Sequence, residues 1–220
     1  MANSVLLLGA TGLVGQECLR LLLKDDFYSK IVVLARRDLQ DEFKDERLES
    51  HIVNFDRLDD HKEFFGSDQI ICTLGATMAK AGSKDNFYKV DYGYPYEAAK
   101  LALASGAEHY LLVSALGADE NSRIFYNRVK GELERSLKKL GFRSLSIFRP
   151  SLLIGERKEF RFGEEVGKVV SNIFSFAIPP KYKPIEASEL AKAIIKVAKN
   201  DFPGIRIIES DSIRTIARTD

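Results

Sequence analysis

The residues with the clearest capacity for chemistry are a tyrosine and a lysine four positions apart, Tyr126 and Lys130. Side chains at this spacing project from one face of a helix, so a phenol and an ammonium group would act at one place. A free phenol has a pKa of about 10, and a neighbouring ammonium favours its ionised form. The pair therefore predicts a general acid or base at Tyr126 with Lys130 as its electrostatic partner. The alternative is a partly buried tyrosine beside a lysine whose stem lies along apolar surface.

A hydroxyl group stands upstream of this pair, at Ser114, where an apolar run ends. If that run is a strand, Ser114 lies at its carboxyl end, and its hydroxyl could hold a substrate oxygen against the phenol. Lys130 could also donate a hydrogen bond to the ribose beside a nicotinamide ring and so locate that ring. We therefore expect Ser114, Tyr126 and Lys130 to be the catalytic residues.

Three glycines near the start of the chain follow the spacing Gly-x-x-Gly-x-x-Gly. An apolar strand is predicted before them and a helix after Gly12, so they fall in the turn where a dinucleotide pyrophosphate binds. The backbone N–H groups of such a turn and the helix dipole favour phosphate, and no Lys-Ser/Thr pair of an ATP-binding loop follows. A structural turn without a ligand is the alternative. The expected pyrophosphate-binding residues are Gly9, Thr11, Gly12, Leu13, Val14 and Gly15.

The second predicted strand ends in two consecutive arginines, Arg36 and Arg37. A site that prefers NAD usually carries an acid at this place, where it binds the ribose 2′-hydroxyl. Guanidinium groups instead pair with phosphate and stack on adenine, and no carboxylate before Asp38 would repel a 2′-phosphate. The pattern predicts NADP(H) over NAD(H). The alternative is a solvated basic turn.

Two further strand ends are expected at the same rim of the sheet. Asn54 and Phe55 follow the third predicted strand, where an amide could reach the adenine amino group and a ring could cover its face. Leu74, Gly75 and Ala76 follow the fourth, where a glycine admits the ribose close to the backbone. We expect all five residues to contact the cofactor.

Apolar runs rich in valine, isoleucine and leucine alternate with stretches of helical periodicity, and the runs are continuous, as in strands covered on both faces. Such alternation implies right-handed crossovers and a parallel sheet. The fold class is therefore α/β, a doubly wound parallel sheet of the Rossmann type with a small C-terminal portion on the substrate side. Strands are predicted near 4–9, 30–35, 51–54, 69–74, 109–114, 143–149 and 204–209, and helices near 12–24, 58–65, 85–105, 122–140, 163–176 and 187–199.

Residues 1–220 show no internal repeat and no linker, so we expect a single domain. One region, 155–186, departs from the alternation because it carries glycines, a charged run and three prolines that stop a helix. It follows the sixth predicted strand, where a doubly wound sheet opens its ligand crevice. It is either a segment that covers the substrate or a surface loop with one helix.

Composition excludes several classes of function. The 33 basic and 32 acidic residues leave a formal charge of +1, which removes the main support for a nucleic-acid partner. Cys18 and Cys72 lie in apolar runs, as is typical of small buried hydrophobic residues, and the three histidines lack metal-ligand spacing, so no metal is predicted. No apolar run approaches the roughly 20 residues of a spanning helix, and the N-terminal run is too short for a secretory signal. A cytoplasmic location is therefore expected.

Together these motifs resemble those of atypical short-chain dehydrogenases/reductases, with the pair Tyr126 and Lys130 and the serine Ser114. More narrowly, the chain is similar over essentially its whole length to the Tat-interacting-protein-like oxidoreductases. The similarity rests on the segments 72–77 (CTLGAT), 80–82 (KAG), 90–91 (VD), 126–132 (YNRVKGE) and 149–155 (RPSLLIG). The resemblance implies a Rossmann domain that binds NADPH, with the segment from Pro150 to Leu153 flanking the nicotinamide.

The chain departs from the pattern of these relatives at two places, which limits what the resemblance implies about substrate and cofactor contacts. The chain after Ile154 is too short for the sugar-binding portion of related epimerases, and Asn54 stands where many relatives have an acid. The leading hypothesis is an NADP(H)-dependent oxidoreductase acting on a carbonyl or alcohol of unidentified substrate. The alternative is a redox-sensing regulator that binds NADPH, turns over little and presents a surface to a protein partner. The family resemblance also suggests a homodimer through helices 85–105 and 122–140.

Overall fold

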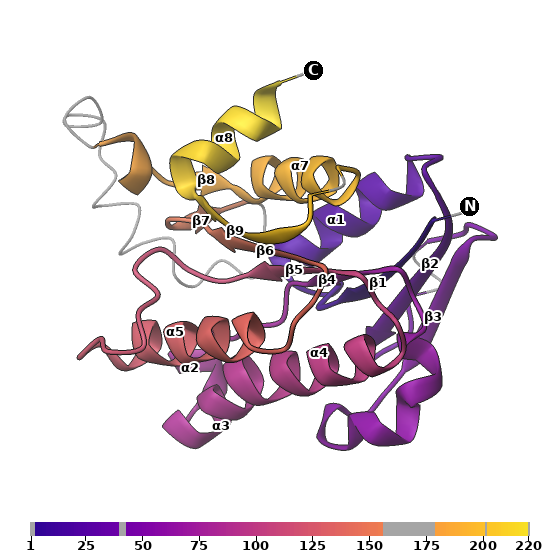
Figure 1. The fold of residues 1–220 in the computed structure, drawn as a ribbon, viewed down its shortest axis with the longest axis horizontal. Helices are drawn as coiled ribbons and strands as arrows, with labels where there is room; N and C mark the ends of the chain where they lie inside the picture. The colour runs from indigo at the N-terminus through magenta and orange to yellow at the C-terminus, as the bar shows by residue number, and fades with distance from the viewer. Residues whose placement is uncertain (1–2, 40–42, 156–178, 201, 220) are drawn as a thin grey trace.

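The computed structural model describes residues 3–39, 43–155, 179–200 and 202–219. Seven parallel strands form one sheet in the order β3-β2-β1-β4-β5-β6-β9, so the chain begins in the middle of the sheet and winds outward to both sides (Figure 1). This order confirms the predicted doubly wound sheet. The strands are β1 (Asn3–Leu8), β2 (Tyr28–Ala35), β3 (Leu48–Ile52), β4 (Gln69–Cys72), β5 (His109–Val113), β6 (Ser144–Arg149) and β9 (Gly204–Glu209).

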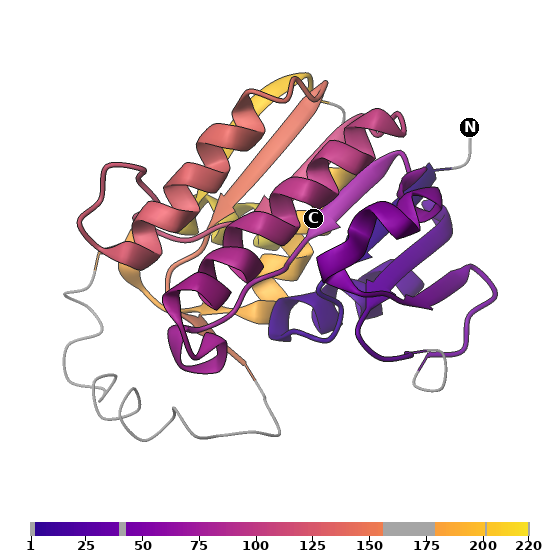
Figure 2. The ribbon, with the colours of Figure 1, turned by 90° about the horizontal axis from the view of Figure 1, so that it is seen from below.

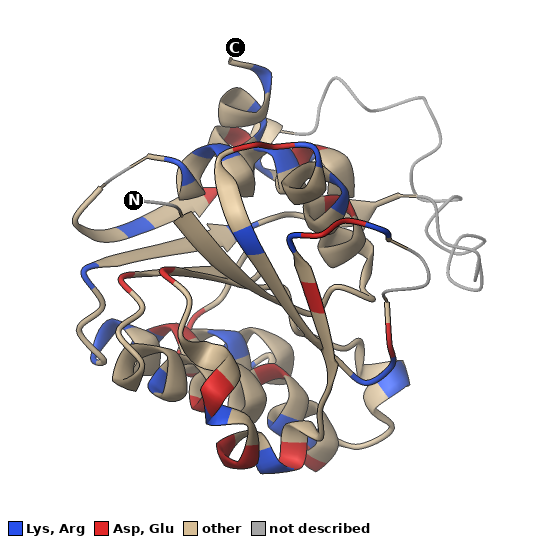
Figure 3. Cartoon of the chain, turned by 90° about the vertical axis from the view of Figure 1, so that its right-hand side faces the viewer, with Lys and Arg blue, Asp and Glu red and all other residues tan. Residues whose placement is uncertain are grey.

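Helices cover both faces of this sheet. On one face pack α1 (Leu13–Leu23), α7 (Ala187–Ala198) and α8 (Ser210–Arg218), and on the other α4 (Tyr94–Ala104) and α5 (Phe125–Lys138). Figure 2 shows α4 and α5 side by side across the second face. Figure 3 shows basic and acidic residues interspersed along the described helices and loops.

Each face of the sheet has its own hydrophobic core, because successive strand residues point to opposite sides. In β1, Val5 and Leu7 belong to the core under α1 and α7, whereas Leu6 and Leu8 belong to the core under α4 and α5. Burial on both sides explains why the run from Val5 to Leu8 in β1 is apolar without interruption. Cys18 is fully buried in the first core, where burial raises the pKa of its thiol, as expected of a structural cysteine.

One long helical rod precedes β5. It consists of α3 (Lys84–Tyr88), a π-helical turn (Lys89–Gly93) and α4, and it confirms the helix predicted over 85–105. Proline lacks an N–H and crowds the carbonyl four residues earlier, so Pro95 cannot continue an α-helical ladder back to Asp91. The Tyr94 N–H instead bonds to the carbonyl of Lys89, which widens the helix by one residue.

Some short elements differ from the sequence prediction. A 3₁₀ segment (Phe55–Phe65) replaces the α-helix expected over 58–65, with non-helical backbone at Arg57 and His61. The one-turn helix α2 (Met78–Ala81) and the helix α8 are not among the predicted elements. One or two turns contain too few residues for a periodic pattern to be recognised. The helix predicted over 163–176 lies outside the described residues.

The described part of 155–186 returns to the sheet beside the end of β6. Strands β7 (Leu153–Ile154) and β8 (Ile185–Glu186) pair in parallel, and a 3₁₀ turn (Pro180–Tyr182) precedes β8. The guanidinium of Arg214 on α8 donates a hydrogen bond to the carbonyl of Pro184 at 2.9 Å, and it also bonds the carbonyls of Pro180 and Lys183. The segment after residue 178 is thus attached to the C-terminal helix.

Candidate functional site

A cavity of about 1500 Å³ opens at the carboxyl ends of β1, β2 and β4, on the side where the strand order reverses. Doubly wound sheets open their ligand crevice at this point. The volume exceeds the roughly 300–1,000 Å³ of most small-molecule pockets. The predicted residues that line it are Gly9, Thr11, Gly12, Leu13, Arg36, Arg37, Phe55, Leu74, Gly75 and Ala76.

The glycine turn is closed so tightly that side chains are excluded from it. A Cβ on Gly15 would lie 2.1 Å from the carbonyl oxygen of Gly9, and a Cβ on Gly9 would lie 2.6 Å from the hydroxyl of Thr73. The Gly12 N–H donates to the Gly9 carbonyl at 2.8 Å, and α1 begins at the next residue. The start of α1 therefore faces the cavity with bare backbone, which fits a dinucleotide pyrophosphate.

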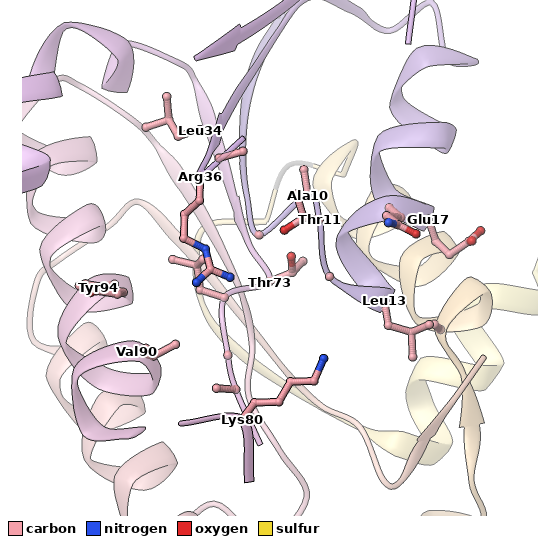
Figure 4. Close-up of a pocket in the computed structure, with 18 of the residues that line it drawn as sticks. Ala10, Thr11, Leu13, Glu17, Leu34, Arg36, Thr73, Lys80, Val90 and Tyr94 are labelled. Carbon is pink, nitrogen blue, oxygen red and sulfur yellow. The ribbon is translucent and has the colours of Figure 1, made fainter. Parts of the chain in front are cut away.

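Positively charged side chains reach into the cavity from two elements. Figure 4 shows Arg36, at the end of β2, and Lys80, on α2, extending into the space between the glycine turn and the helix that carries Val90 and Tyr94. Both are exposed to solvent. Anionic groups of a ligand would therefore meet cations at both places.

Lys130 lies behind the cavity wall rather than in the open cavity. Its Nζ is 2.7 Å from Oδ1 of Asp91, and the two side chains are 4% and 1% exposed. A Cβ on Gly75, which lines the cavity, would lie 3.5 Å from this Nζ and 3.2 Å from the Asp91 oxygen. Because Gly75 has no side chain, the ion pair is separated from the cavity by backbone alone.

The protonation state of Lys130 follows from this partner. Burial by itself lowers the pKa of the ammonium, but Asp91, with smaller contributions from Tyr126 and Cys72, raises it by more. The pKa of Lys130 consequently lies above its ordinary value. The group is a cation at neutral pH.

Tyr126 is half-buried at the start of α5, one turn before Lys130. Its ring packs against the cluster formed by Ala81, Phe87 and Val129, with its centroid 5.5 Å from that of Phe87. Ala81 lines the cavity, so this cluster connects the tyrosine to one residue of the cavity wall. The structure thus brings Tyr126 and Lys130 next to the cavity, but neither contributes to its lining.

Ser114 is placed differently from the expectation. Its hydroxyl donates a hydrogen bond of 2.6 Å to Oε1 of Glu134, which is 1% exposed. Arg149 donates to both oxygens of the same carboxylate, at 2.9 Å from Nε and 2.6 Å from Nη2. The serine hydroxyl therefore belongs to a buried charge network between α5 and the sheet.

The other predicted cofactor residues outside the cavity lining have structural partners. Val14 is buried in the core under α1, and the Asn54 side chain accepts a hydrogen bond from the Asp56 N–H as a helix cap. Pro150 is buried and its carbonyl accepts from Leu116, whereas Leu153 belongs to β7. These four residues, like Gly15, do not line the cavity.

Sequence reasoning did not assign a site role to Lys80 or Asp91. Both stand in short segments, KAG and VD, that carried the resemblance to the Tat-interacting-protein-like oxidoreductases. Glu186 and Ser188, at the start of α7, also line the cavity from more than a hundred residues beyond the glycine turn. No local pattern marks them, because only the packing of α7 beside α1 brings them there.

Comparison with known families now adds to this geometry. Residues 5–175 match the model of the NAD dependent epimerase/dehydratase family. The chain belongs to this family. A curated relative, protein HTATIP2 of Rattus norvegicus, is 40% identical over 166 residues, which cover 74% of this chain and 67% of the relative. The likeness to the Tat-interacting-protein branch of the short-chain dehydrogenases/reductases is thereby confirmed.

Several solved structures share the fold. UDP-glucose 4-epimerase from Thermotoga maritima superimposes with a TM-score of 0.71 at 13% identity and covers 94% of this chain and 76% of its own. The Bordetella bronchiseptica enzyme WbmH, solved in complex with NAD+, gives a TM-score of 0.71 at 14% identity over 95% of this chain and 76% of its own. These matches confirm the Rossmann-type fold predicted from the sequence.

The expected cytoplasmic location is wrong in the light of a further relative. Protein FMP52 of Candida albicans, 35% identical over 91% of this chain and 90% of its own, is named mitochondrial. The relatives named mitochondrial point away from a cytoplasmic location. The sequence-based expectation was wrong because the lack of a secretory signal excludes only secretion. Among the described residues, no helix has both the length and the apolarity needed to cross a bilayer.

Proposed function

We propose that this protein is an NADP(H)-dependent oxidoreductase that interconverts a carbonyl and an alcohol. The observation that carries this proposal is the position of the Lys130 ammonium, held by Asp91 directly behind the Gly75 backbone of the cavity wall. A cation at this point, one helical turn from Tyr126, can donate a hydrogen bond to a nearby ribose and can stabilise a phenolate. In this proposal the glycine turn holds the pyrophosphate at one end of the cavity, and Tyr126 acts at the other.

The proposed chemistry divides between cofactor and protein. When bound, the reduced nicotinamide supplies a hydride to the carbonyl carbon and is left oxidised. Tyr126 donates its phenolic proton to the carbonyl oxygen, which becomes the alcohol hydroxyl, and regains a proton from water. Lys130 stabilises the transient phenolate and hydrogen-bonds the ribose. Arg36 and Arg37 bind the 2′-phosphate of the adenosine.

Replacing the proton donor tests the mechanism. Tyr126→Phe removes the phenolic hydroxyl but keeps the ring that packs on Phe87, so NADPH affinity should stay within about twofold while kcat falls by about 10²–10⁴-fold. Turnover is measured as NADPH oxidation with a panel of carbonyl compounds, and affinity by fluorescence titration. Tyr96→Phe, on α4 outside the cavity lining, serves as the matched control. Equal turnover in the Tyr126 and Tyr96 variants would refute the role.

Charge reversal tests the cofactor preference. The double variant Arg36→Glu/Arg37→Glu should weaken NADPH binding by about tenfold or more and NADH binding much less, since only NADPH carries the 2′-phosphate. Arg57→Glu/Lys62→Glu, at two exposed cations outside the cavity lining, changes the net charge by the same amount and serves as the control. An equal loss for both cofactors, or a greater loss for NADH, would overturn the NADP(H) assignment.

A second candidate function has its own support. The Ser114 hydroxyl is bonded to Glu134, so the expected partner of the substrate oxygen is engaged elsewhere. This favours a protein that binds NADPH and responds to its redox state without rapid turnover. The two functions separate in one experiment: purified protein that releases NADPH on denaturation but oxidises none with any carbonyl compound is the regulator.

A further inference from the structure

Asp91 is buried in a helix where a carboxylate needs strong compensation. It lies in the π-helical turn between α3 and α4 and is 1% exposed. Both of its oxygens are occupied: Oδ1 lies 2.7 Å from the Lys130 ammonium, and Oδ2 accepts the N–H of Ala76 at 2.7 Å. The single carboxylate therefore ties α5 to the cavity wall that follows β4.

The π-helical turn and Gly75 both contribute to this arrangement. Asp91 lies in the widened turn, where Pro95 has no N–H that could bond the Asp91 carbonyl in a regular α-helix. Such π-helical turns frequently occur at functional sites. Gly75 leaves the approach open, because any Cβ there would lie 3.2 Å from the Asp91 oxygen. A side chain at residue 75 would therefore crowd the ion pair and require the Asp91 carboxylate to shift.

The electrostatic surroundings of Lys130 come from three elements. Asp91 faces it from the π-helical turn, Tyr126 from its own helix and Cys72 from β4. Burial raises the pKa of the Cys72 thiol, so this group is uncharged at neutral pH. The Asp91 carboxylate, 2.7 Å from the ammonium, is the ion-pair partner that offsets the cost of burying it.

We propose that Asp91 is a positioning residue of the site, whose carboxylate keeps the Lys130 ammonium charged and fixed against the Gly75 and Ala76 wall of the cavity. This inference rests on the proposed function for the use that is made of the ammonium. A buried lysine without a counter-charge loses its proton more readily. Without Asp91, the phenol of Tyr126 would lose its cation as the pH rises toward the alkaline range.

The direct test measures the ionisation of Lys130 in cofactor-free protein. Lysine side chains are labelled with ¹³C at Cε, and the Lys130 signal is assigned with Lys130→Arg. In Asp91→Asn the amide oxygen can still accept the Ala76 N–H, so only the charge is removed. We expect Lys130 to titrate at least about one pH unit lower in Asp91→Asn than in the unmodified protein. Titration at the same pH in both would overturn the proposal.

The control breaks an exposed ion pair on α4 instead. Glu97→Gln removes the partner of Lys100, whose Nζ lies 2.8 Å from the carboxylate. Both side chains are more than a third exposed. This variant should leave the Lys130 signal unchanged. A shift of Lys130 in Glu97→Gln as large as that in Asp91→Asn would show a general effect of net charge and would overturn the assignment to Asp91.

A pH profile links the pair to turnover. In Asp91→Asn, kcat should be close to normal at about pH 6 and should fall at alkaline pH earlier than in the unmodified protein, because Lys130 then becomes neutral. A purely structural role would lower kcat by a similar factor at every pH and would contradict the proposal. If Tyr126→Phe keeps full turnover, the proposed function fails, while the titration of Lys130 still decides the role of Asp91.

A second route covers a variant that does not fold. Lys130→Met leaves the Asp91 carboxylate buried without its cation, and Asp91→Asn/Lys130→Met replaces both charges. If the two groups compensate each other, the thermal midpoint of the double variant should lie above that of Lys130→Met. A double variant less stable by the sum of the separate losses would overturn the pairing.

Discussion

Helix α5 carries two buried ionic groups on the face that meets the sheet, four residues apart, and they differ in what surrounds them. Glu134 accepts hydrogen bonds from the Ser114 hydroxyl and from two nitrogens of Arg149, so both of its oxygens are engaged within the protein. Lys130 is paired with one oxygen of Asp91 and lies behind the bare backbone of Gly75 at the cavity. An ammonium has three donors, so Lys130 can serve a ligand in addition to its partner.

This difference separates an ion pair that holds the fold together from one that is suited to a site. Arg149 continues the first network outward, since its Nη1 lies 3.4 Å from Glu209 at the end of β9. The Glu134 carboxylate, through its hydrogen bonds, raises the pKa of Arg149. We expect changes in the Glu134 network to affect stability, and changes at Lys130 and Asp91 to affect the pH dependence of turnover.

The largest expected effect follows from removing the shared carboxylate. Glu134→Ala leaves the guanidinium of Arg149 largely uncompensated and the Ser114 hydroxyl without its acceptor, so the free energy of unfolding should fall by about 3–5 kcal/mol. Urea denaturation followed by circular dichroism measures it. Glu134→Gln, which keeps an acceptor oxygen, should cost less. A loss below about 1 kcal/mol in Glu134→Ala would contradict the structural role of this network.

A smaller effect is expected at Ser114. Ser114→Ala removes one donor of the three that Glu134 accepts, and the free energy of unfolding should fall by about 1.5 kcal/mol. Because this hydroxyl is directed to Glu134, kcat should change by less than about tenfold. The same urea denaturation and NADPH oxidation assays apply. A loss of kcat of about 10²-fold or more at normal stability would show that Ser114 turns toward the substrate.

Much of the fold followed from local patterns. The apolar runs within β1, β2 and β5 are continuous because these strands are covered on both faces, and the ends of α1 and α7 agree with the predictions to within a residue or two. β3 lies a few residues earlier than expected, and the helix predicted near 58–65 is a 3₁₀ segment that spans Phe55–Phe65. Both lie at the edge of the sheet, where fewer neighbours impose a regular pattern.

The candidate site was only partly accessible from the sequence. The glycine turn and the arginines after β2 have spacings that express their geometry directly, so their placement at one cavity was predictable. The partner of Ser114 was not, since Glu134 carries no local mark that distinguishes it from a solvated helix residue. The same holds for Asp91, because nothing in the local sequence distinguishes it from an exposed acidic residue. Its ion pair with Lys130 depends on the packing of its helix against β4 and α5.

By itself, the amino-acid sequence determined the order of strands and helices, the tight glycine turn at the start of α1 and the spacing of Tyr126 from Lys130, because each depends on residues within a few positions of one another. The tertiary structure alone decided which charges met. Packing placed Asp91 next to Lys130 and Ser114 next to Glu134. A buried ionic group must pair with an opposite charge or a hydrogen-bond partner, and the packed helices determine which one is close enough.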